Sequence, residues 1–193
     1  MHYDIAIVGY GPVGAAAASM FGKKGFNTVV IEPKKDIWDI PRAVHFDGQV
    51  QRVYQSMGIS SEVEKIIDIM TGITFLNHKG NKIVSLNMNN APRKNSYHED
   101  VMFDQPKFER ILRNHAEKNK NIDFKIGSYV SKLDPRESGN LLEIFDTNTN
   151  KISEISASYV IGADGADSFV RKSTKIKSKD FKEDEDWIVV DYL

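Results

Sequence analysis

The chain has 193 residues, of which 40% are hydrophobic and 27% charged, and its formal net charge is −1. This balance is typical of a globular protein of one domain or slightly more, without the basic surface that binds nucleic acid or anionic membrane. No cysteine is present, which excludes disulfides and cysteine-based catalysis or metal binding among these residues. Because no apolar run approaches the roughly 20 residues that span a bilayer, and Met1–Asp4 lacks the start of a secretory signal, we expect a cytoplasmic protein with no nucleic-acid or membrane partner.

The first elements predict a βαβ unit. Ile5–Val8 is a continuous apolar run within a strand expected over Asp4–Gly9, which is typical of a strand buried on both faces. A helix is expected over about Pro12–Lys24, because proline suits a first helical turn. A second buried strand, Thr28–Glu32, completes the unit, whose crossover we expect to be right-handed.

The turn between this strand and helix carries the pattern G-x-G-x-x-G in Gly9-Tyr10-Gly11-Pro12-Val13-Gly14. In a dinucleotide site the first glycine permits a tight turn, the second lets a pyrophosphate approach the backbone, and the third lets helix and strand touch. Unpaired N–H groups and the positive end of the helix dipole then face the phosphates. The candidate pyrophosphate-binding residues are Gly9, Gly11, Pro12, Val13 and Gly14.

Glu32 ends the second strand, 18 residues past Gly14, where an acid accepts hydrogen bonds from an adenosine ribose. We therefore interpret the segment as a dinucleotide site, the alternative being a glycine-rich structural turn. A carboxylate at this place also disfavours a 2′-phosphate, because two negative charges would meet.

After this unit, the sequence predicts an irregular stretch, two short helices, a hairpin and a loop. A longer helix and four strands are expected next, and the last three of these strands are expected to form an antiparallel meander. A buried strand, a turn, a short helix and a final strand complete the chain's expected elements. This order differs from the repeated βα units of an ordinary NAD domain. The expected ranges are Pro33–His45, Asp47–Met57, Ser61–Ile67, Ile73–Leu76 with Lys82–Met88, Asn89–Glu99, Pro106–Lys118, Asp123–Ile126, Tyr129–Leu133, Leu141–Asp146, Ile152–Ala157, Tyr159–Gly162, Ala163–Gly165, Phe169–Ser173 and Trp187–Asp191.

Five segments, in order and spacing, resemble the N-terminal part of FAD-dependent aromatic-ring hydroxylases, the class A flavoprotein monooxygenases that hydroxylate 3-(3-hydroxyphenyl)propionate, phenol or p-hydroxybenzoate. The segments are Asp4–Gly14, Pro41–Asp47, Gln105–Leu112, Gly162–Arg171 and Trp187–Asp191.

The resemblance implies an α/β fold, an FAD-binding Rossmann-like domain of the glutathione-reductase type with a parallel sheet and an antiparallel β-meander over residues 1–180. The hairpin within 73–88 would belong to the substrate side, and residues 181–193 would begin the sheet of a substrate domain.

The resemblance also implies roles for single residues. The three glycines would hold the FAD pyrophosphate and Glu32 the adenosine ribose. Arg42 would lie near the pyrophosphate, Gln105 would hold the ribityl chain, and the turn Asp164-Gly165 would serve FAD and nicotinamide phosphates. Asp47 occupies the place of an active-site carboxylate and is the catalytic candidate.

Each of these residues has a structural alternative. In these alternatives, Arg42 would pair with Asp36 or Asp39 on the surface, Gln105 would only begin a helix, and Asp164-Gly165 would be an ordinary turn. Asp47 caps the helix that follows it. His45 and His115 are expected to be structural, and no metal site is expected.

The expected function is the FAD-binding part of an NAD(P)H- and O2-dependent monooxygenase of a phenolic substrate, with NADH or NADPH as co-substrate. The sequence contains no Gly-Asp dipeptide, with which the family makes a second flavin contact, and lacks most of a substrate domain. We therefore expect a C-terminal half or a partner chain. The alternatives are a non-catalytic or truncated FAD-binding chain, another FAD oxidoreductase, and an NAD-dependent dehydrogenase.

Overall fold

The computed structural model describes all residues except 90–92, 94–95, 183–184, 187, 189 and 191–193. The chain forms two compact units, one of Met1–Ile37 with Leu112–Leu193 and one of Trp38–Ile111. The strand expected at Trp187–Asp191 lies largely outside the described residues. The domain boundary expected at residue 180 stays a prediction.

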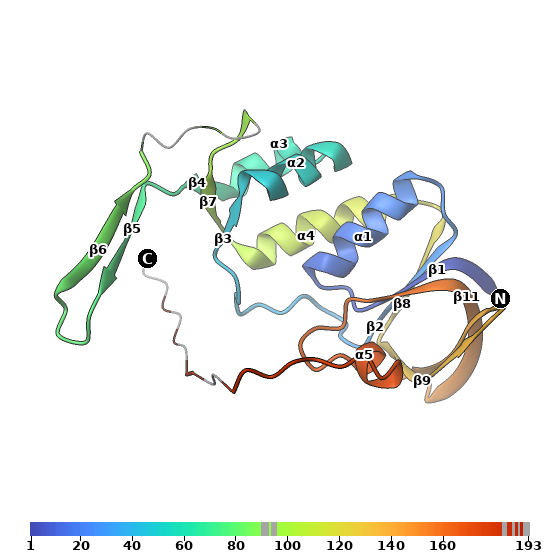
Figure 1. The fold of residues 1–193 in the computed structure, drawn as a ribbon. Coiled ribbons are helices and arrows are strands. Elements are labelled where there is room, and N and C mark those ends of the chain that lie inside the picture. Colours follow the sequence, from blue (N-terminus) through green and yellow to red (C-terminus); the bar gives the residue numbers. More distant parts are fainter. Residues whose placement is uncertain (90–92, 94–95, 183–184, 187, 189, 191–193) are drawn as a thin grey trace. The chain divides into compact units, whose positions relative to one another are not determined.

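A six-stranded sheet forms the centre of the first unit, in the order β8-β2-β1-β11-β10-β9 (Figure 1). Its parallel part confirms the predicted βαβ unit, and its antiparallel part confirms the predicted meander. The strands are β1 (His2–Val8), β2 (Thr28–Glu32), β8 (Ile122–Ile126), β9 (Ser128–Arg136), β10 (Gly139–Asp146) and β11 (Lys151–Gly162).

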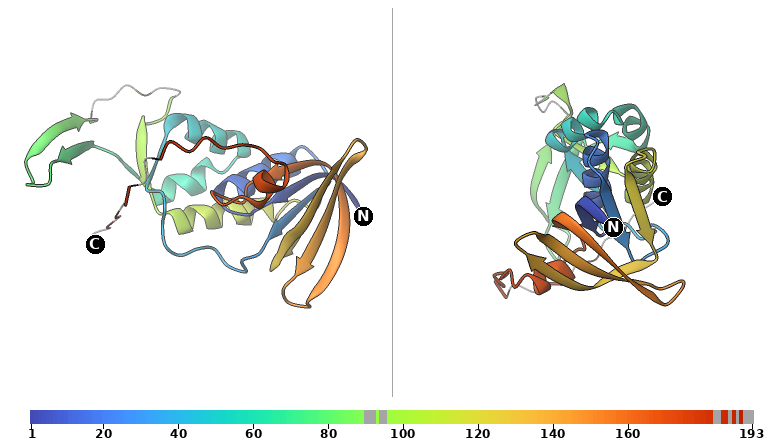
Figure 2. Two further views of the ribbon diagram at one scale, coloured as in Figure 1. Left: turned by 60° about the horizontal axis from the view of Figure 1, so that its bottom comes forward. Right: turned by 90° about the vertical axis from the view of Figure 1, so that its right-hand side faces the viewer.

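Strand β11 is a single strand of 12 residues, whereas the sequence pattern predicted two strands separated at Ser158. Its first half pairs antiparallel with β10, up to Ala157, and its second half pairs parallel with β1, up to Gly162. The prediction was wrong because Ser158 does not shift the register with β1: Ala157 pairs with Tyr3 and Tyr159 pairs with Ile5. The Ser158 hydroxyl lies 3.2 Å from Nε2 of His2. Figure 2 shows this long orange strand beside the yellow strands of the meander.

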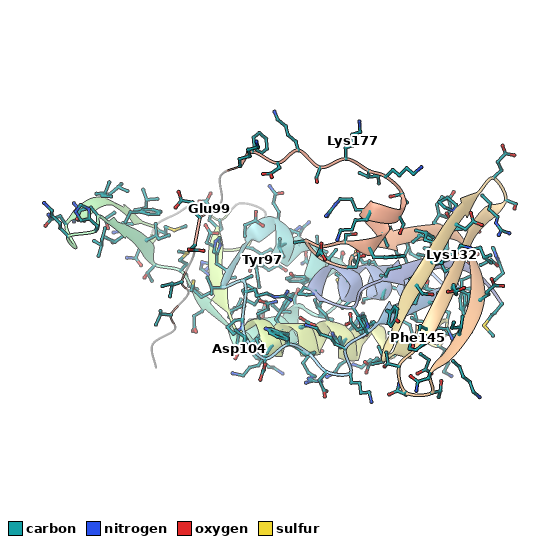
Figure 3. All side chains as sticks on the ribbon, turned by 90° about the horizontal axis from the view of Figure 1, so that it is seen from below. Tyr97, Glu99, Asp104, Lys132, Phe145 and Lys177 are labelled. Carbon is teal, nitrogen blue, oxygen red and sulfur yellow. The ribbon has the colours of Figure 1, made fainter. Side chains whose placement is uncertain are left out.

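Helix α1 (Pro12–Lys23) packs small residues on the sheet. Its buried positions are Gly14, Ala15, Ala18, Ser19 and Gly22, so helix and strands can approach closely. All five residues of β2 are buried, as the continuous apolar run predicts. On the meander, Phe145 of β10 stacks on Tyr129 of β9 with ring centroids 5.2 Å apart. Phe145 is labelled in Figure 3.

The second unit contains a three-stranded sheet that the sequence pattern did not predict. Strand β7 (Asp100–Phe103) lies between β3 (His45–Asp47) and β4 (Ile67–Ile69). Strands of three or four residues are too short to show a period of two, which is why they were missed. The predicted hairpin is present as β5 (Gly72–Leu76) and β6 (Lys82–Asn87).

The helices of this unit are α2 (Gly48–Met57) and α3 (Ser60–Val63), followed by a 3-10 turn, Glu64–Ile66. An aromatic cluster forms its core, in which Phe46, Tyr54, Phe103 and Phe108 lie with ring centroids 4.9–5.7 Å apart.

Two further helices are present, α4 (Gln105–Ala116) and α5 (Phe169–Ser173). Helix α5 has the predicted bounds. The division between the two units falls within α4. Among the described residues, no helix is long and apolar enough to cross a membrane.

Candidate cofactor-binding site

Two of the glycines that follow β1, Gly9 and Gly14, are required by close backbone packing. Gly9 has a φ of +101°, and a Cβ there would lie 2.3 Å from the carbonyl oxygen of Ala163. A Cβ on Gly14 would lie 2.0 Å from the carbonyl oxygen of Gly9. A side chain at either position would therefore displace backbone, as the G-x-G-x-x-G pattern predicts.

Gly11 differs from these two glycines, because a Cβ built on it would meet no atom within 4 Å. The space beside Gly11 is open at the N-terminus of α1, where no side chain caps the helix. Pro12 carries no N–H, and Val13 is 70% exposed. Free backbone N–H groups and the helix dipole make such a place suited to an anionic phosphate.

Glu32 lies at the end of β2, and its side chain forms a hydrogen bond with the glycine turn that follows β1. It is 8% exposed. Its Oε2 accepts a hydrogen bond from the backbone N–H of Tyr10 at 2.7 Å, and its Oε1 accepts one from Lys34 N–H at 2.9 Å. Each carboxylate oxygen has a further lone pair, so Glu32 can still accept hydrogen bonds from the hydroxyls of a ribose.

Asp164 follows the β11 strand, and its carboxylate is directed into its own turn. Oδ1 accepts a hydrogen bond from Ser168 Oγ at 2.6 Å, and Oδ2 accepts one from Val170 N–H at 3.0 Å. Gly165 has a φ of +83°, which explains the glycine of the Asp-Gly turn.

In the second unit, Gln105 and Arg42 come together across 63 residues of sequence. Gln105 is 7% exposed, and its Oε1 accepts hydrogen bonds from Arg42 N–H at 2.6 Å and Ala43 N–H at 2.8 Å. The Arg42 side chain is exposed, and within the described part of the chain it forms no ion pair with Asp36 or Asp39. The surface pairing considered for Arg42 is therefore absent there.

The model of the family described as FAD binding domain matches residues 2–193. The chain belongs to this family. FAD is therefore the dinucleotide of the site, and the open space at Gly11, the uncapped α1 N-terminus and the carboxylate of Glu32 fit its diphosphate and ribose.

Curated relatives of this FAD-binding domain are hydroxylases. The 3-(3-hydroxy-phenyl)propionate/3-hydroxycinnamic acid hydroxylase of Paraburkholderia xenovorans LB400 is 30% identical over 190 residues, covering 97% of this chain and 30% of the relative. A probable NADH-specific resorcinol 4-hydroxylase of Rhodococcus jostii RHA1 is 26% identical, covering 98% of this chain and 36% of the relative. The FAD-binding domain thus spans about a third of the length of these relatives.

Solved structures confirm the fold. The flavin-dependent monooxygenase PieE, in complex with FAD and substrate, gives a TM-score of 0.81 at 22% identity, covering 91% of this chain and 32% of that one. The p-nitrophenol 4-monooxygenase PnpA of Pseudomonas putida DLL-E4 gives 0.81 at 22% identity, covering 89% and 43%.

The catalytic candidate of the FAD-binding domain, Asp47, caps α2. Its Oδ1 accepts hydrogen bonds from Gln49 N–H at 3.0 Å and Val50 N–H at 2.9 Å, so the alternative considered for it, a helix cap, is present. Its Oδ2 takes part in no hydrogen bond among the described residues. Burial, followed by the charge of Asp47, raises the pKa of Tyr54 above its usual range. A catalytic role for Asp47 stays a prediction.

The sequence pattern did not indicate the contacts of Tyr10, which lies between the first two glycines of the turn. Tyr10 is 1% exposed, its hydroxyl donates to the carbonyl oxygen of Arg113 at 3.2 Å, and the Arg113 guanidinium lies 4.6 Å from the centre of its ring. Burial raises the pKa of Tyr10, so the phenol is neutral. Ser19 Oγ of α1 forms a hydrogen bond with His115 Nδ1, which agrees with a structural His115.

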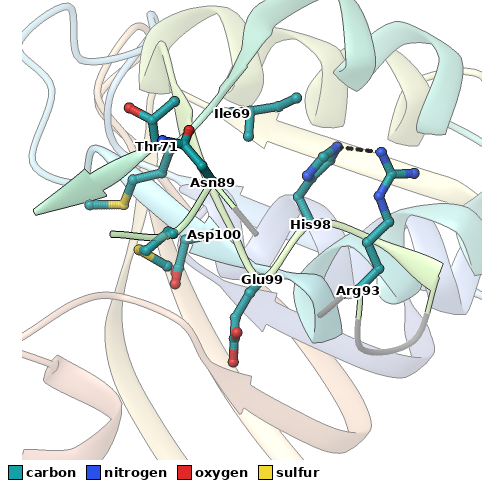
Figure 4. A pocket seen from close by; sticks show the side chains of 9 residues that line it. Ile69, Thr71, Asn89, Arg93, His98, Glu99 and Asp100 are labelled. Atoms are coloured by element: carbon teal, nitrogen blue, oxygen red, sulfur yellow. Dashed lines mark hydrogen bonds between the residues drawn. The ribbon is translucent and has the colours of Figure 1, made fainter. Parts of the chain in front are cut away.

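The second unit also contains a pocket of about 320 Å³, lined by residues of β4, β7 and the loop before β7. His98 Nε2 lies 3.1 Å from the Arg93 guanidinium, a contact drawn as a dashed line in Figure 4. Because arginine only donates, Nε2 is the acceptor and the proton of a neutral His98 is on Nδ1. No sequence motif indicated this pocket.

Proposed function

We propose that this FAD-binding domain is the FAD-holding part of an NAD(P)H- and O2-dependent monooxygenase that hydroxylates a phenolic substrate. The observation that carries the proposal is the family match over residues 2–193, joined to an open phosphate cradle at Gly11. The names of the curated relatives support the phenolic substrate and a nicotinamide co-substrate.

Bound FAD supplies the redox and oxygen chemistry, and the protein supplies binding, orientation and exclusion of water. The N–H groups of the first α1 turn would hold the diphosphate, and Glu32 the adenosine ribose. The family resemblance assigns to Arg42, whose side chain is exposed, a role in holding the diphosphate. Its backbone is held by Gln105, so less freedom is lost when the cofactor binds.

Asp47 is proposed to accept the proton of the phenol. Its Oδ1 is occupied by the helix cap, which leaves Oδ2 for a substrate hydroxyl. A positioned carboxylate that takes a proton during reaction is a general base.

We further propose that turnover needs a substrate pocket, which the longer relatives form with residues outside the matched region. For this chain, a C-terminal half or a partner chain would supply those residues. A cytoplasmic location is proposed on the absence of cysteine from the 193 residues, which fits a reducing compartment.

The decisive experiment is titration of the purified 193-residue chain with FAD, followed by flavin fluorescence and visible absorbance. Saturable FAD binding, with no comparable binding of NADH to the flavin-free chain, is the expected result. NADH binding in place of FAD would favour a dehydrogenase and contradict the proposal.

Catalysis is tested by mixing the flavin-loaded chain with the unmatched part of the Paraburkholderia relative. Substrate-dependent NAD(P)H oxidation is expected. Tight FAD binding without any turnover would favour a non-catalytic FAD-binding chain.

A further inference from the structure

The turn between β11 and α5 is in direct contact with the phosphate-binding glycines. A Cβ on Gly9 would lie 2.3 Å from the carbonyl oxygen of Ala163 and 2.9 Å from the nitrogen of Asp164. The Ala163 N–H donates to the carbonyl oxygen of Val8 at 2.8 Å, and a Cβ on Gly14 would lie 3.5 Å from the Ala163 Cβ. The peptide between Ala163 and Asp164 therefore forms one wall of the glycine turn.

Three hydrogen bonds hold the Asp164 side chain and the turn that follows this peptide. Asp164 accepts from Ser168 Oγ at 2.6 Å and from Val170 N–H at 3.0 Å. Ser168 Oγ in turn accepts from Arg171 N–H at 3.0 Å, and Ser168 is 8% exposed. We name this set of bonds between Asp164, Ser168, Val170 and Arg171 the Asp164 bracket.

The direction of the carboxylate decides what Asp164 can do for the cofactor. Both of its oxygens are engaged by donors of its own turn and of α5. A carboxylate turned instead towards a diphosphate would place like charges together, which is unfavourable without a cation between them.

We propose that Asp164 is a positioning residue of the FAD cradle. Through the Asp164 bracket it holds the Ala163–Asp164 peptide against Gly9, and it does not bind FAD through its carboxylate. The inference rests on the proposed function of the chain. It assigns the same positioning role to Ser168, which lies four residues after Asp164 in the sequence.

The test compares Asp164→Asn, Ser168→Ala and Ser168→Thr in the full 193-residue chain by FAD titration. Loss of a hydrogen bond to a charged group predicts a Kd for FAD about tenfold higher in both D164N and S168A. S168T keeps the hydroxyl and should restore binding. The double variant D164N/S168A should bind no more weakly than either single variant, because both changes break the same bracket.

Two control variants separate positioning from general loss of stability. Asp167→Asn removes a charge three residues away, from a side chain that pairs only with the exposed Lys172 among the described residues. Thr174→Ala removes the hydrogen bond from Thr174 Oγ1 to the carbonyl oxygen of Val170, which weakens α5 but leaves the bracket intact. Both should bind FAD as the wild type does.

Amide hydrogen exchange of the flavin-free chain reads the same coupling without FAD. The Gly9 and Ala163 N–H groups, bonded to the carbonyl oxygens of Ile31 and Val8, should exchange about tenfold faster in S168A and unchanged in T174A. If the wild type binds no FAD, the proposed function fails, and the exchange rates alone decide the positioning role.

Three results would overturn the inference. Weak FAD binding in D164N with normal binding in S168A would mean that the carboxylate contacts the cofactor directly. Equal losses in S168A and T174A would mean that only the stability of α5 matters. Unchanged exchange at Gly9 and Ala163 in S168A would mean that the bracket does not reach the glycine turn.

Discussion

Glu32 accepts a hydrogen bond of 2.7 Å from the backbone N–H of Tyr10, so the acid that ends β2 is fastened to the turn that follows β1. The bond places the proposed ribose-binding group and the proposed phosphate-binding turn in one rigid arrangement. A change at Glu32 therefore acts on both.

Glu32→Gln should raise the Kd for FAD about tenfold, because an amide offers one acceptor oxygen where the carboxylate offers two. Glu32→Leu should bind FAD still more weakly and also unfold at lower urea concentration, because the buried Tyr10 N–H then has no acceptor. Titration and urea denaturation measure the two effects. Glu154→Gln, an exposed change in β11, is the control, and equal FAD affinity of E32Q and wild type would contradict the role.

Gly11→Ser should abolish FAD binding while the flavin-free chain keeps its stability. Outside Gly11 and its two chain neighbours, no atom lies within 4 Å of a Cβ at Gly11, so the new side chain would project into the space proposed for the cofactor. Serine is a good residue at the start of a helix. Thermal unfolding of the flavin-free variant and FAD titration together check the prediction. A G11S chain that binds FAD normally would show that the diphosphate lies elsewhere.

Gln105→Leu should weaken FAD binding about tenfold, because the backbone of Arg42 and Ala43 loses its shared acceptor. Gln105→Glu keeps an acceptor at the same place and should bind FAD nearly as well as the wild type. Gln51→Leu, which removes another buried glutamine of the same unit, controls for general destabilisation. An equal loss in Q105E and Q105L would indicate that the side-chain NH2 contacts the cofactor directly.

Asp47→Ser should keep the cap of α2 and remove the carboxylate, since serine is also a strong N-cap. In the reconstituted enzyme we expect turnover about a hundredfold slower, as is common when a general base is removed, with unchanged thermal stability. Asp47→Ala should lose turnover and also about 1 kcal/mol of stability. Full activity of D47S would assign Asp47 to the helix cap alone.

Asp104 should make the stability of α4 dependent on pH. A hydrogen bond from Lys107 N–H, at 3.1 Å, is the main cause that lowers the pKa of Asp104 below its usual value. A group whose pKa is lower in the folded state stabilises fully above the unfolded pKa, near 3.8, and loses this contribution as pH falls through the folded pKa. The difference in urea midpoint between wild type and Asp104→Asn should be constant above about pH 5 and vanish in stronger acid. A difference that does not change with pH would disprove the role of the Asp104 carboxylate.

The sequence predicted the parts of the fold that local chemistry decides. The βαβ unit was predicted from continuous apolar runs and from the spacing of the glycines between the first strand and its helix. Helix α5 was predicted from a short pattern after the Asp-Gly turn. The three-stranded sheet of β3, β7 and β4 was missed, because its pairs join residues tens of positions apart and its strands are too short for a period to appear.

The sequence singles out the candidate site residues by type and place, and their role stays a prediction; it does not indicate the contacts that they make in the structure. The bond between Glu32 and Tyr10 depends on the register of β1 and β2, and the bonds between Gln105 and Arg42 cross 63 residues. Neither leaves a local signal. Asp164 and Ser168 are only four residues apart, so their hydrogen bond could have been expected from spacing, yet the sequence does not show which way the carboxylate turns.

Strand β11 belongs to two ladders at once, with β10 along its first half and with β1 along its second. One residue inserted near Ser158 would exchange the faces of every side chain beyond it. It would also advance the end of the strand by about 3.3 Å, taking Ala163 out of register with Gly9. A longer turn at Glu137–Ser138 would have neither effect. Among proteins with this fold, the spacing from Lys151 to Ala163 should therefore tolerate no change in length, while the hairpin turn beside it is free to vary.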